Sequence, residues 1–472
     1  MYKFVTSDGK EFKTLNSRDY FSNYSVNTII AVSESTIIRA VPDDFIGLST
    51  EIDYRLDTFL KNVSTYPRIT QLFRNLKPSI VRFGGTGCDH PGGAYWDPDG
   101  TYHFGGDKWY YGTITKEFVD MVFNFLASIG WKAIWQINLG SNNPTLFADE
   151  ANYVYTKWSN RLVGIHIGNE PEGYVANGDR PSGWGYSEYK PEWESYHTAI
   201  RALNTSIPLA GTDSYSYTWV KGFTADEYTH LTYVSQHYYP TSAVGSGFSA
   251  PTIVNLLSST LADRTLTSLK TWVSGAASYG LQVSLSESNS TSNSGTAGVS
   301  DVFASALWAV DYMFTALEQG IKNINFHGFN VTVVYSIFQP TGIPNPIYYA
   351  LLLYCYAAPN GNSVASRTMS DCNVKSYSIV GADGKLRVVI VNKDLVTDSK
   401  IKINPSQNYT SAGAIFMQAT DVTSTDVTLG GTTVSETDGT WDVGPLVSVP
   451  IVNGSAYLTV PKASAAVVTF TF

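Results

Sequence analysis

Two short segments of this 472-residue chain each end an apolar β-run in a glutamate. They are IHIGNEPEGY at 165–174, which carries Glu170, and VSLSESNS at 283–290, which carries Glu287. A carboxylate at the carboxyl tip of an apolar strand is typical of a barrel active site, where side chains from several strand ends meet. Two such carboxylates are the minimum equipment for breaking a glycosidic bond. The pair therefore predicts a site for sugar hydrolysis.

The residues around the pair fit this chemistry. Asn169 precedes Glu170, and an amide at that position can hydrogen-bond a sugar 2-hydroxyl. The run QHYY at 236–239 places a tyrosine at the same rim, where a phenol that donates to a carboxylate keeps it ionised. Burial would raise the pKa of the carboxyl that acts as the acid. A retaining mechanism needs its two carboxyls about 5–5.5 Å apart, one as acid/base and one as nucleophile.

Residues 43–358 alternate short apolar runs with longer amphipathic stretches. The apolar runs are FIGLSTEI (45–52), IVRFGG (80–85), AIWQINLG (133–140), LVGIHIGNE (162–170), PLAGTD (208–213), LTYVSQHYY (231–239), QVSLSES (282–288) and NINFHGF (323–329). Helical stretches lie between them, such as 115–130 and 300–320, and for the second Ser300 and Gly320 predict an N-cap and a C′ residue. Eight strand–helix units predict an α/β fold, a (β/α)₈ TIM barrel in which Glu170 ends strand four and Glu287 ends strand seven.

After residue 358 the chain changes to alternating Val, Thr and Ser runs with Gly and Asp turns. The stretch 377–394 predicts a hairpin around ADGK, and residues 359–472 as a whole predict an all-β sandwich. The segment 1–42 contains a strand-like run at 27–42, which we expect to pair into the sandwich because a lone hairpin is marginally stable. The predicted parts are thus N-terminal strands (1–42), a barrel (43–358) and a C-terminal sandwich (359–472).

Composition limits the partners and the compartment. The net charge of −9 argues against nucleic acid and anionic membranes as partners, and no apolar run is long enough to span a bilayer. The three cysteines fit no metal site and allow at most one disulfide. The first residues lack the apolar region of a signal peptide, so the protein is intracellular or begins after a removed signal. Seven Asn-X-Ser/Thr sequons permit secretion, which we expect.

The motifs, taken in order, resemble glycoside hydrolase family 79, the β-glucuronidase and heparanase family of the clan A retaining glycosidases. The resemblance rests on FIGLSTE, VRFGG, INLG, IGNEP, HYY, SESNS followed by GVSDVFASALWAVD, and INFHG. It implies Glu170 as acid/base, Glu287 as nucleophile and Tyr239 as the hydrogen-bond partner of the nucleophile. It also implies residues that line the −1 subsite, namely Glu51, Asn138 and Asn169. No metal or organic cofactor is expected, and the expected partner is a carbohydrate bound by a monomer.

One segment departs from the family pattern. Family glucuronidases usually hold the sugar carboxylate with a tyrosine and a glycine pair just past the nucleophile, whereas the loop here is STSNSGTAG (290–298). Ser292 stands where the tyrosine is expected, and the side chains or backbone of Ser292, Asn293, Ser294 or Gly295 could still donate to a carboxylate. Tyr335 could supply the phenol. The first prediction is therefore a β-glucuronidase for glucuronic or 4-O-methylglucuronic acid. The alternatives are a neutral-sugar β-glucosidase, β-galactosidase or β-xylosidase, and a non-catalytic carbohydrate-binding protein.

Four other polar residues near the predicted site have structural alternatives. Arg82 is expected to be an ion-pair partner beneath the site rather than a substrate ligand, and His237 a scaffold imidazole rather than a catalyst. Glu172 competes with Glu170 for the role of acid but is expected to be a loop residue. For His327 both a rim ligand and a core residue remain open.

Overall fold

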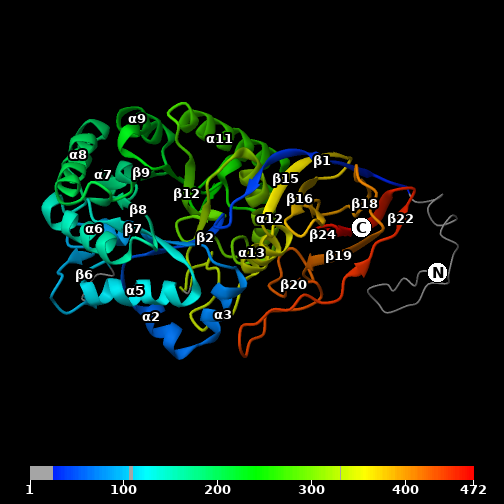
Figure 1. Cartoon of the computed structure of the whole chain (residues 1–472), viewed down its shortest axis with the longest axis horizontal. Coiled ribbons are helices and arrows are strands. Elements are labelled where there is room, and N and C mark those ends of the chain that lie inside the picture. The colour runs from blue at the N-terminus through cyan, green and yellow to red at the C-terminus, as the bar shows by residue number, and fades with distance from the viewer. Residues whose placement is uncertain (1–24, 106–109, 330) are drawn as a thin grey trace.

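The computed structural model describes residues 25–472 except 106–109 and 330, and residues 46–327 contain a closed barrel (Figure 1). The eight barrel strands are all parallel and follow in circular order β2 (Ile46–Glu51), β3 (Ile80–Gly84), β7 (Lys132–Ile137), β8 (Leu162–Ile167), β9 (Leu209–Ser214), β10 (Val234–Tyr238), β12 (Val283–Ser288) and β14 (Ile324–His327). Each predicted apolar run forms one of these strands, and the (β/α)₈ barrel is confirmed.

Helices cover the outside of the barrel, as the amphipathic stretches between the strands predict. They are α2 (Tyr54–Thr65), α3 (Arg68–Asn75), α4 (Thr86–Asp89), α5 (Lys116–Ile129), α6 (Pro144–Trp158), α7 (Tyr174–Asn177), α8 (Tyr186–Leu203), α9 (Tyr217–Glu227), α10 (Ile253–Leu257), α11 (Ser259–Ala277), α12 (Phe303–Gln319) and α13 (Pro346–Ala357). Helix α5 shows the local signals clearly. The Thr115 hydroxyl accepts from the Phe118 N–H at its start, and Gly130 ends it with a positive φ of 78°.

The start of α12 differs from the prediction. Gly320 does end the helix with a φ of 92°, but Ser300 is not its N-cap, because the helix begins at Phe303. The N–H groups of Phe303 and Ala304 donate instead to the carbonyls of Ser424 and Val422, at 2.9 and 3.0 Å. A loop from the C-terminal part of the chain therefore satisfies the groups that a local serine would otherwise cap.

Residues 361–471, together with residues 28–41, form a single curled sheet of 11 strands in the described residues. Its strands are β1 (Thr28–Val41), β15 (Gly361–Ser370), β16 (Val374–Gly381), β17 (Leu386–Asn392), β18 (Ser399–Asn404), β19 (Ser411–Gln418), β20 (Thr428–Leu429), β21 (Val447–Ser448), β22 (Ile451–Val452), β23 (Ser455–Val460) and β24 (Ser464–Thr471). Strand β1 pairs antiparallel with β15 and parallel with β18. The N-terminal run at 27–42 thus joins the sandwich, whereas residues 1–24 of the predicted N-terminal part lie outside the described residues.

The sheet buries both of its faces, and strand β17 shows how. Val388 and Ile390 point into a core enclosed within the curled sheet, while Val389 and Val391 belong to the core shared with the barrel. Alternate side chains of a strand lie on opposite faces, so one β-branched run serves both cores. Figure 1 shows α12 and α13 between the barrel and the sheet, in the position where these side chains pack.

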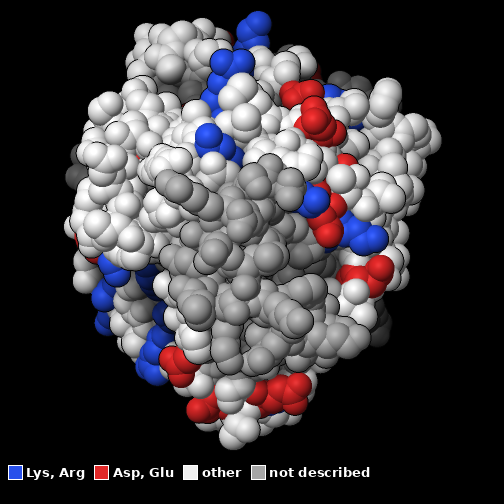
Figure 2. Space-filling view, turned by 90° about the vertical axis from the view of Figure 1, so that its right-hand side faces the viewer, with Lys and Arg blue, Asp and Glu red and all other residues white. Residues whose placement is uncertain are grey.

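Short elements decorate the rim of the barrel. Strands β4 (Tyr95–Trp96), β5 (His103–Phe104) and β6 (Gly112–Ile114) form one small sheet, and β11 (Thr241–Ser242) pairs in parallel with β13 (Thr291–Ser292). At the sandwich end, the visible described surface mixes lysine and arginine with aspartate and glutamate (Figure 2). Within residues 25–105, 110–329 and 331–472, no helix combines the length and the apolar character that crossing a membrane requires.

Candidate active site

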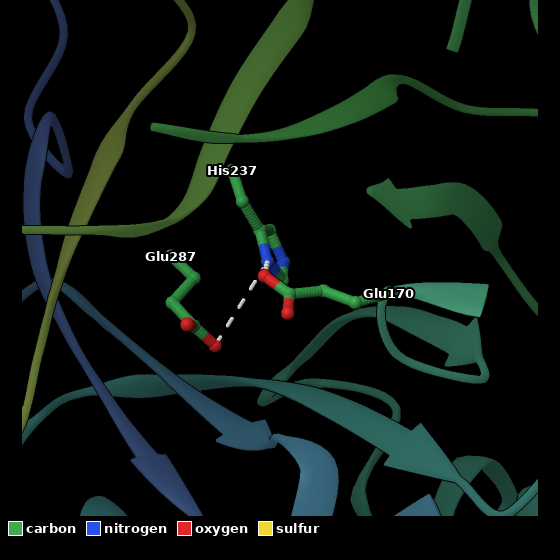
Figure 3. Close-up of side chains that lie close together, drawn as sticks. All are labelled: Glu170, His237 and Glu287. Carbon is green, nitrogen blue, oxygen red and sulfur yellow. Dashed lines mark hydrogen bonds and ion pairs between the residues drawn. The ribbon is translucent and has the colours of Figure 1, made fainter. Parts of the chain in front are cut away.

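Glu170 and Glu287 meet at the carboxyl end of the barrel. Glu170 lies three residues past the end of β8, the fourth barrel strand. Glu287 lies in β12, the seventh barrel strand. Figure 3 shows both carboxylates and the ring of His237 pointing toward one another. One ligand atom from each of these three side chains lies within 4.8 Å of the others. The carboxyls of retaining glycosidases lie at a similar separation, about 5–5.5 Å.

The backbone at Glu170 is held in an uncommon conformation. Its φ is 47°, its N–H donates to the Asp213 carbonyl at 2.7 Å, and Pro171 begins the short 3₁₀ helix η1 (Pro171–Gly173). The carboxylate accepts from His237 Nδ1 at 2.7 Å, and the side chain remains 25% exposed. Burial raises the pKa of Glu170, the charges of Glu287 and Glu172 add to the rise, and the bond from His237 opposes it only partly.

Glu287 is surrounded by donors. Its Oε2 accepts from Arg82 Nη1 at 2.8 Å, its Oε1 accepts from the Tyr239 hydroxyl at 2.8 Å, and His327 Nδ1 lies 3.7 Å away. Burial by itself would raise the pKa of Glu287. The interactions with His327, His237, Arg82 and Tyr239 outweigh it and lower that pKa to about 2.

The two carboxyls are therefore pushed in opposite directions. The carboxyl with the raised pKa can hold a proton and give it to a leaving oxygen. The carboxyl with the lowered pKa stays ionised and can attack a carbon. Pairs of titratable groups whose environments separate their pKa values in this way identify the acid and the nucleophile of a site.

A buried network of charged side chains lies below Glu170 and Glu287 and influences the pKa values of these two carboxyls. Arg82 Nη2 donates to Asp213 at 2.6 Å, and Asp213 also lies 2.9 Å from His166 Nδ1 and 3.3 Å from His237 Nε2. Asp213 is fully buried, and Arg82 and the two histidines hold its pKa well below the usual range despite burial. Burial would lower the pKa of His237, but Glu287, Asp213 and Glu170 raise it to about 10. His237 therefore carries a positive charge between three carboxylates at neutral pH.

Asn169 and Glu51 lie beside this network. Asn169 Oδ1 accepts from Arg82 Nη2 at 2.6 Å. Glu51 ends β2, its Oε2 accepts from the Gly87 N–H at 2.8 Å, and its Oε1 lies 3.7 Å from His327 Nε2. Gly85 has a φ of 92°, and a Cβ there would meet Glu51 Oε2 at 2.1 Å, which explains the second glycine of VRFGG.

Asn138 has a different environment from the other predicted subsite residues. It is fully buried, its Nδ2 donates to the His90 carbonyl at 3.2 Å, and its Oδ1 accepts from the Ser141 N–H at 2.8 Å. The amide thus joins the loop after β7 to the loop after β3, and both of these hydrogen bonds are to backbone groups. Its role as a sugar ligand stays a prediction.

The loop past Glu287 is a turn joined to the segment around Tyr335. Asn293 and Ser294 have φ values of 56° and 68°, and the Gly295 N–H returns to the Ser292 carbonyl at 3.4 Å. The Ser294 carbonyl accepts from Val334 N–H at 3.0 Å. The buried Tyr335 ring lies 6.2 Å from the Tyr239 ring and nearly parallel to it. Tyr335 therefore lies near the nucleophile, and the serine turn lies next to it at the rim.

Comparison with known proteins places this geometry in context. No family model matches the chain. A β-glucuronidase of Aspergillus niger is 25% identical over 293 residues, which are 53% of this chain and 52% of that protein. The chain is similar to the β-glucuronidases. The resemblance to glycoside hydrolase family 79 is confirmed, although the chain spans only about half the length of this curated relative.

Solved structures support the same fold. A 4-O-α-L-rhamnosyl-β-D-glucuronidase from Fusarium oxysporum, in complex with Rha-GlcA, has a TM-score of 0.77 at 19% identity and covers 93% of this chain and 100% of its own. A family 51 α-L-arabinofuranosidase from Bifidobacterium longum has a TM-score of 0.71 at 15% identity, with coverages of 94% and 100%. At these identities the likeness shows the shared barrel and sandwich.

The structure also places the four polar residues for which a structural role was an alternative. Arg82 is the buried ion-pair partner described above, and His327 lies between Glu51 and Glu287, at the site itself. His237 contacts the carboxylate of Glu170 directly, so it is more than a scaffold imidazole. Glu172 Oε1 accepts from Ser214 Oγ at 2.6 Å and from Ser216 N–H at 2.9 Å, which fixes it in the loop.

Sequence reasoning missed two carboxylates that build the site. Asp213 ends a predicted apolar strand just as Glu170 and Glu287 do, and that shared position was the available signal. Asp89 accepts from the N–H groups of Leu139, Gly140 and Asn169, at 2.6, 3.1 and 2.7 Å, and from the Tyr174 hydroxyl. It ties together the loops that follow β3, β7 and β8. No local pattern indicated that role.

Glu170, His237 and Glu287 also form a group with the spacing of metal ligands. A metal-binding imidazole must be neutral, whereas the pKa of His237 is raised to about 10. Both oxygens of Glu287 already accept from Arg82 and Tyr239. The donor set therefore fits a protonated imidazole among the carboxyl groups of Glu170, Glu287 and Asp213 better than it fits a metal ion.

Proposed function

We propose that this protein is a retaining β-glycoside hydrolase with Glu170 as acid/base and Glu287 as nucleophile. The observation that carries the proposal is the close approach of two carboxyls whose pKa values are shifted in opposite directions. A carbohydrate-binding protein would not need to shift the pKa values of two neighbouring carboxyls in opposite directions. The likeness to a β-glucuronidase supports the same reaction class.

The first step follows from this arrangement. Glu287 attacks the anomeric carbon, the bond to the leaving oxygen breaks, and the proton of Glu170 passes to that oxygen. Tyr239 and Arg82 hold the Glu287 oxygens, so the attacking carboxylate stays ionised and oriented. Asn169 lies next to the acid, where it would bind the 2-hydroxyl of the sugar as the transition state forms.

The second step reverses the role of Glu170. Once its proton has left, the carboxylate accepts a proton from the incoming water, and the resulting hydroxide displaces Glu287 from the anomeric carbon. Two inversions restore the original β configuration. His237 lies within hydrogen-bond distance of Glu170 and stabilises its anionic form during this step.

For the sugar we propose β-linked glucuronic acid or its 4-O-methyl form at a terminal position. The likeness to the β-glucuronidase of Aspergillus niger and the ordered family motifs support this choice. A second candidate, a neutral β-glucoside, β-galactoside or β-xyloside, is favoured by the rim loop 290–298. That loop offers serine hydroxyls and backbone N–H groups but contains no lysine or arginine to pair with a carboxylate.

Initial rates on a panel of aryl β-glycosides test both points. We expect hydrolysis of the glucuronide well above the glucoside, galactoside and xyloside, with the β-anomer as the first product by NMR. A preference for a neutral sugar would favour the second candidate. An α-anomer as the first product would contradict the retaining mechanism.

Three variants separate catalysis from binding. Glu287→Gln and Glu170→Gln should each lower kcat by several orders of magnitude while sugar binding remains measurable by calorimetry. Glu318→Gln is a matched control, because this carboxyl lies on α12, away from the barrel mouth, and should leave kcat unchanged. A protein that binds sugar equally well in all forms and turns none over would be a binding protein.

We also propose that the protein acts outside the cell on a carbohydrate substrate. Of its sequon asparagines, Asn408 and Asn453 are exposed in the structure. Asn289 is buried, and its amide donates to the carbonyls of His327 and Tyr335, so it cannot carry a glycan in the folded protein. Glycopeptide mapping of secreted protein should therefore find glycans at the first two sites and none at the third.

A further inference from the structure

Tyr215 stands apart from the other tyrosines around the active site. It directly follows β9 at the carboxyl rim of the barrel, and 54% of it is exposed. In the described part of the chain its ring packs against no other aromatic ring, whereas Tyr174 and Tyr335 are buried, Tyr239 is half-buried, and each contacts a carboxylate or a ring. An apolar ring exposed at the mouth of a site is available to a ligand.

The backbone on both sides of Tyr215 is fixed. Glu172 Oε1 accepts from the Ser214 hydroxyl at 2.6 Å and from the Ser216 N–H at 2.9 Å. The Ser216 N–H also lies 3.0 Å from the Ser214 hydroxyl, and helix α9 begins at Tyr217. The ring is therefore presented from a rigid segment, which lowers the entropy lost when a ligand binds to it.

This segment lies beside the acid. The Asp213 carbonyl, two residues before Tyr215, accepts from the Glu170 N–H at 2.7 Å. Burial raises the pKa of Tyr215, and the charges of Glu172 and Glu170 add to that rise. Because the acid protonates the leaving oxygen, the group next to it on the rim faces the leaving group rather than the sugar in the −1 subsite.

We propose that Tyr215 is the platform of a +1 subsite, where its ring stacks on a six-membered ring of the leaving group. The inference rests on the proposed function and adds the leaving-group side to it. A pyranose presents a face of C–H groups and an aryl group presents a π-face. Either face would cover the exposed side of the tyrosine, and contacts of this kind are worth about 3- to 10-fold in affinity.

The test compares leaving groups on one sugar, the one that the panel selects. The substrates are the β-glycosyl fluoride, whose leaving group has no ring, the phenyl β-glycoside and a β-linked disaccharide. The variants are Tyr215→Ala and Tyr215→Phe. Tyr228→Ala is the control, because Tyr228 is 42% exposed in η2 (Tyr228–His230), just before β10, and its ring packs on Tyr279.

We expect Tyr215→Ala to lower kcat/KM on the ringed substrates by about 3- to 10-fold relative to the fluoride, and Tyr215→Phe and the control to preserve the wild-type ratio. A selective loss on the phenyl glycoside assigns the platform to an aryl group, and a selective loss on the disaccharide assigns it to a sugar. Equal changes on all three substrates would overturn the inference. The inference would also be overturned if Tyr215→Phe lowered kcat/KM as much as Tyr215→Ala, because the hydroxyl rather than the ring would then bind the leaving group.

The same experiment distinguishes failure of the proposed function from failure of the Tyr215 platform. If the wild-type protein hydrolyses none of the three substrates, the glycosidase assignment falls and the platform with it. If the wild-type protein hydrolyses them and the variants leave the ratio unchanged, the platform alone is wrong. Thermal unfolding of each variant checks that the exposed substitution leaves the fold intact.

Discussion

Replacing His237 by glutamine should move the whole pH–rate profile of the enzyme to higher pH. His237 donates to Glu170 at 2.7 Å and lies 4.0 Å from Glu287 Oε2, and its positive charge stabilises both carboxylates. Glu170 must be protonated for the first step, so activity is lost as the pH rises through its pKa. Glu287 must be ionised, so activity appears as the pH rises through its pKa. Removal of the cation raises both pKa values, and both limbs shift in the same direction.

The size of the shift follows from the contacts. A hydrogen bond to a charged group contributes about 1.5–3 kcal/mol, and each pKa unit corresponds to about 1.4 kcal/mol. Loss of the bond from His237 should therefore move the alkaline limb up by about 1 to 2 pH units. The acid limb should move less, because Arg82 and Tyr239 still hold the Glu287 carboxylate.

The assay is kcat/KM on an aryl β-glycoside across the pH range, for the wild type and two variants. Glu172→Gln is the matched partner, because the charge of Glu172 raises the pKa of Glu170. Its removal should move the alkaline limb down while His237→Gln moves it up. An alkaline limb that stays in place in His237→Gln, or moves to lower pH, would refute the assignment of Glu170 as the acid held by a charged His237.

Three further predictions concern single side chains. Tyr239→Phe removes the donor to Glu287 Oε1 and should lower kcat/KM about 10- to 100-fold with little change in Tm; a change below twofold would contradict its orienting role. Gly85→Ala should unfold the rim or abolish activity, because the added Cβ would clash with the carboxylate of Glu51. A fully active, stable variant would show that the Glu51 side chain can move away from the added methyl group. Burial raises the pKa of Glu150 to about 8, so the stability it contributes is complete below the ordinary glutamate pKa and is lost as the pH rises toward 8. Urea unfolding should thus give a higher free energy of unfolding at mildly acidic pH than at pH 8, and Glu150→Gln should flatten this dependence.

The barrel and the two carboxylates were predictable because their signals are local. Each barrel strand is a short apolar run, and Glu170 and Glu287 stand at or near the carboxyl ends of two such runs. The continuous apolar run of β17 likewise marks a strand that is buried on both faces. These patterns depend on the period of the strand and on nothing distant in the chain.

The rest of the site depends on contacts between distant residues. Arg82 and Asp213 are 131 positions apart, and only closure of the barrel places them 2.6 Å from each other. Ser300 looked like a helix cap, but a carbonyl from Ser424 takes its place. Asn138 follows an apolar run as Asn169 does, yet its amide binds backbone groups of its own loop and of the loop that contains His90. Sequence patterns indicate which residues end a strand. They do not indicate which side chains from other strands lie next to those residues once the barrel has closed.

In the proposed mechanism Glu287 forms a covalent bond to the sugar, and trapping of this glycosyl-enzyme tests the mechanism directly. The protein would be incubated with the activated 2-deoxy-2-fluoro β-glycoside of its preferred sugar, and the peptic peptides would be analysed by mass spectrometry. We predict inactivation with one added sugar on the peptide that contains Glu287, and no adduct in Glu287→Gln. An adduct on another carboxylate, or turnover of the parent glycoside with no trapped intermediate, would contradict the mechanism.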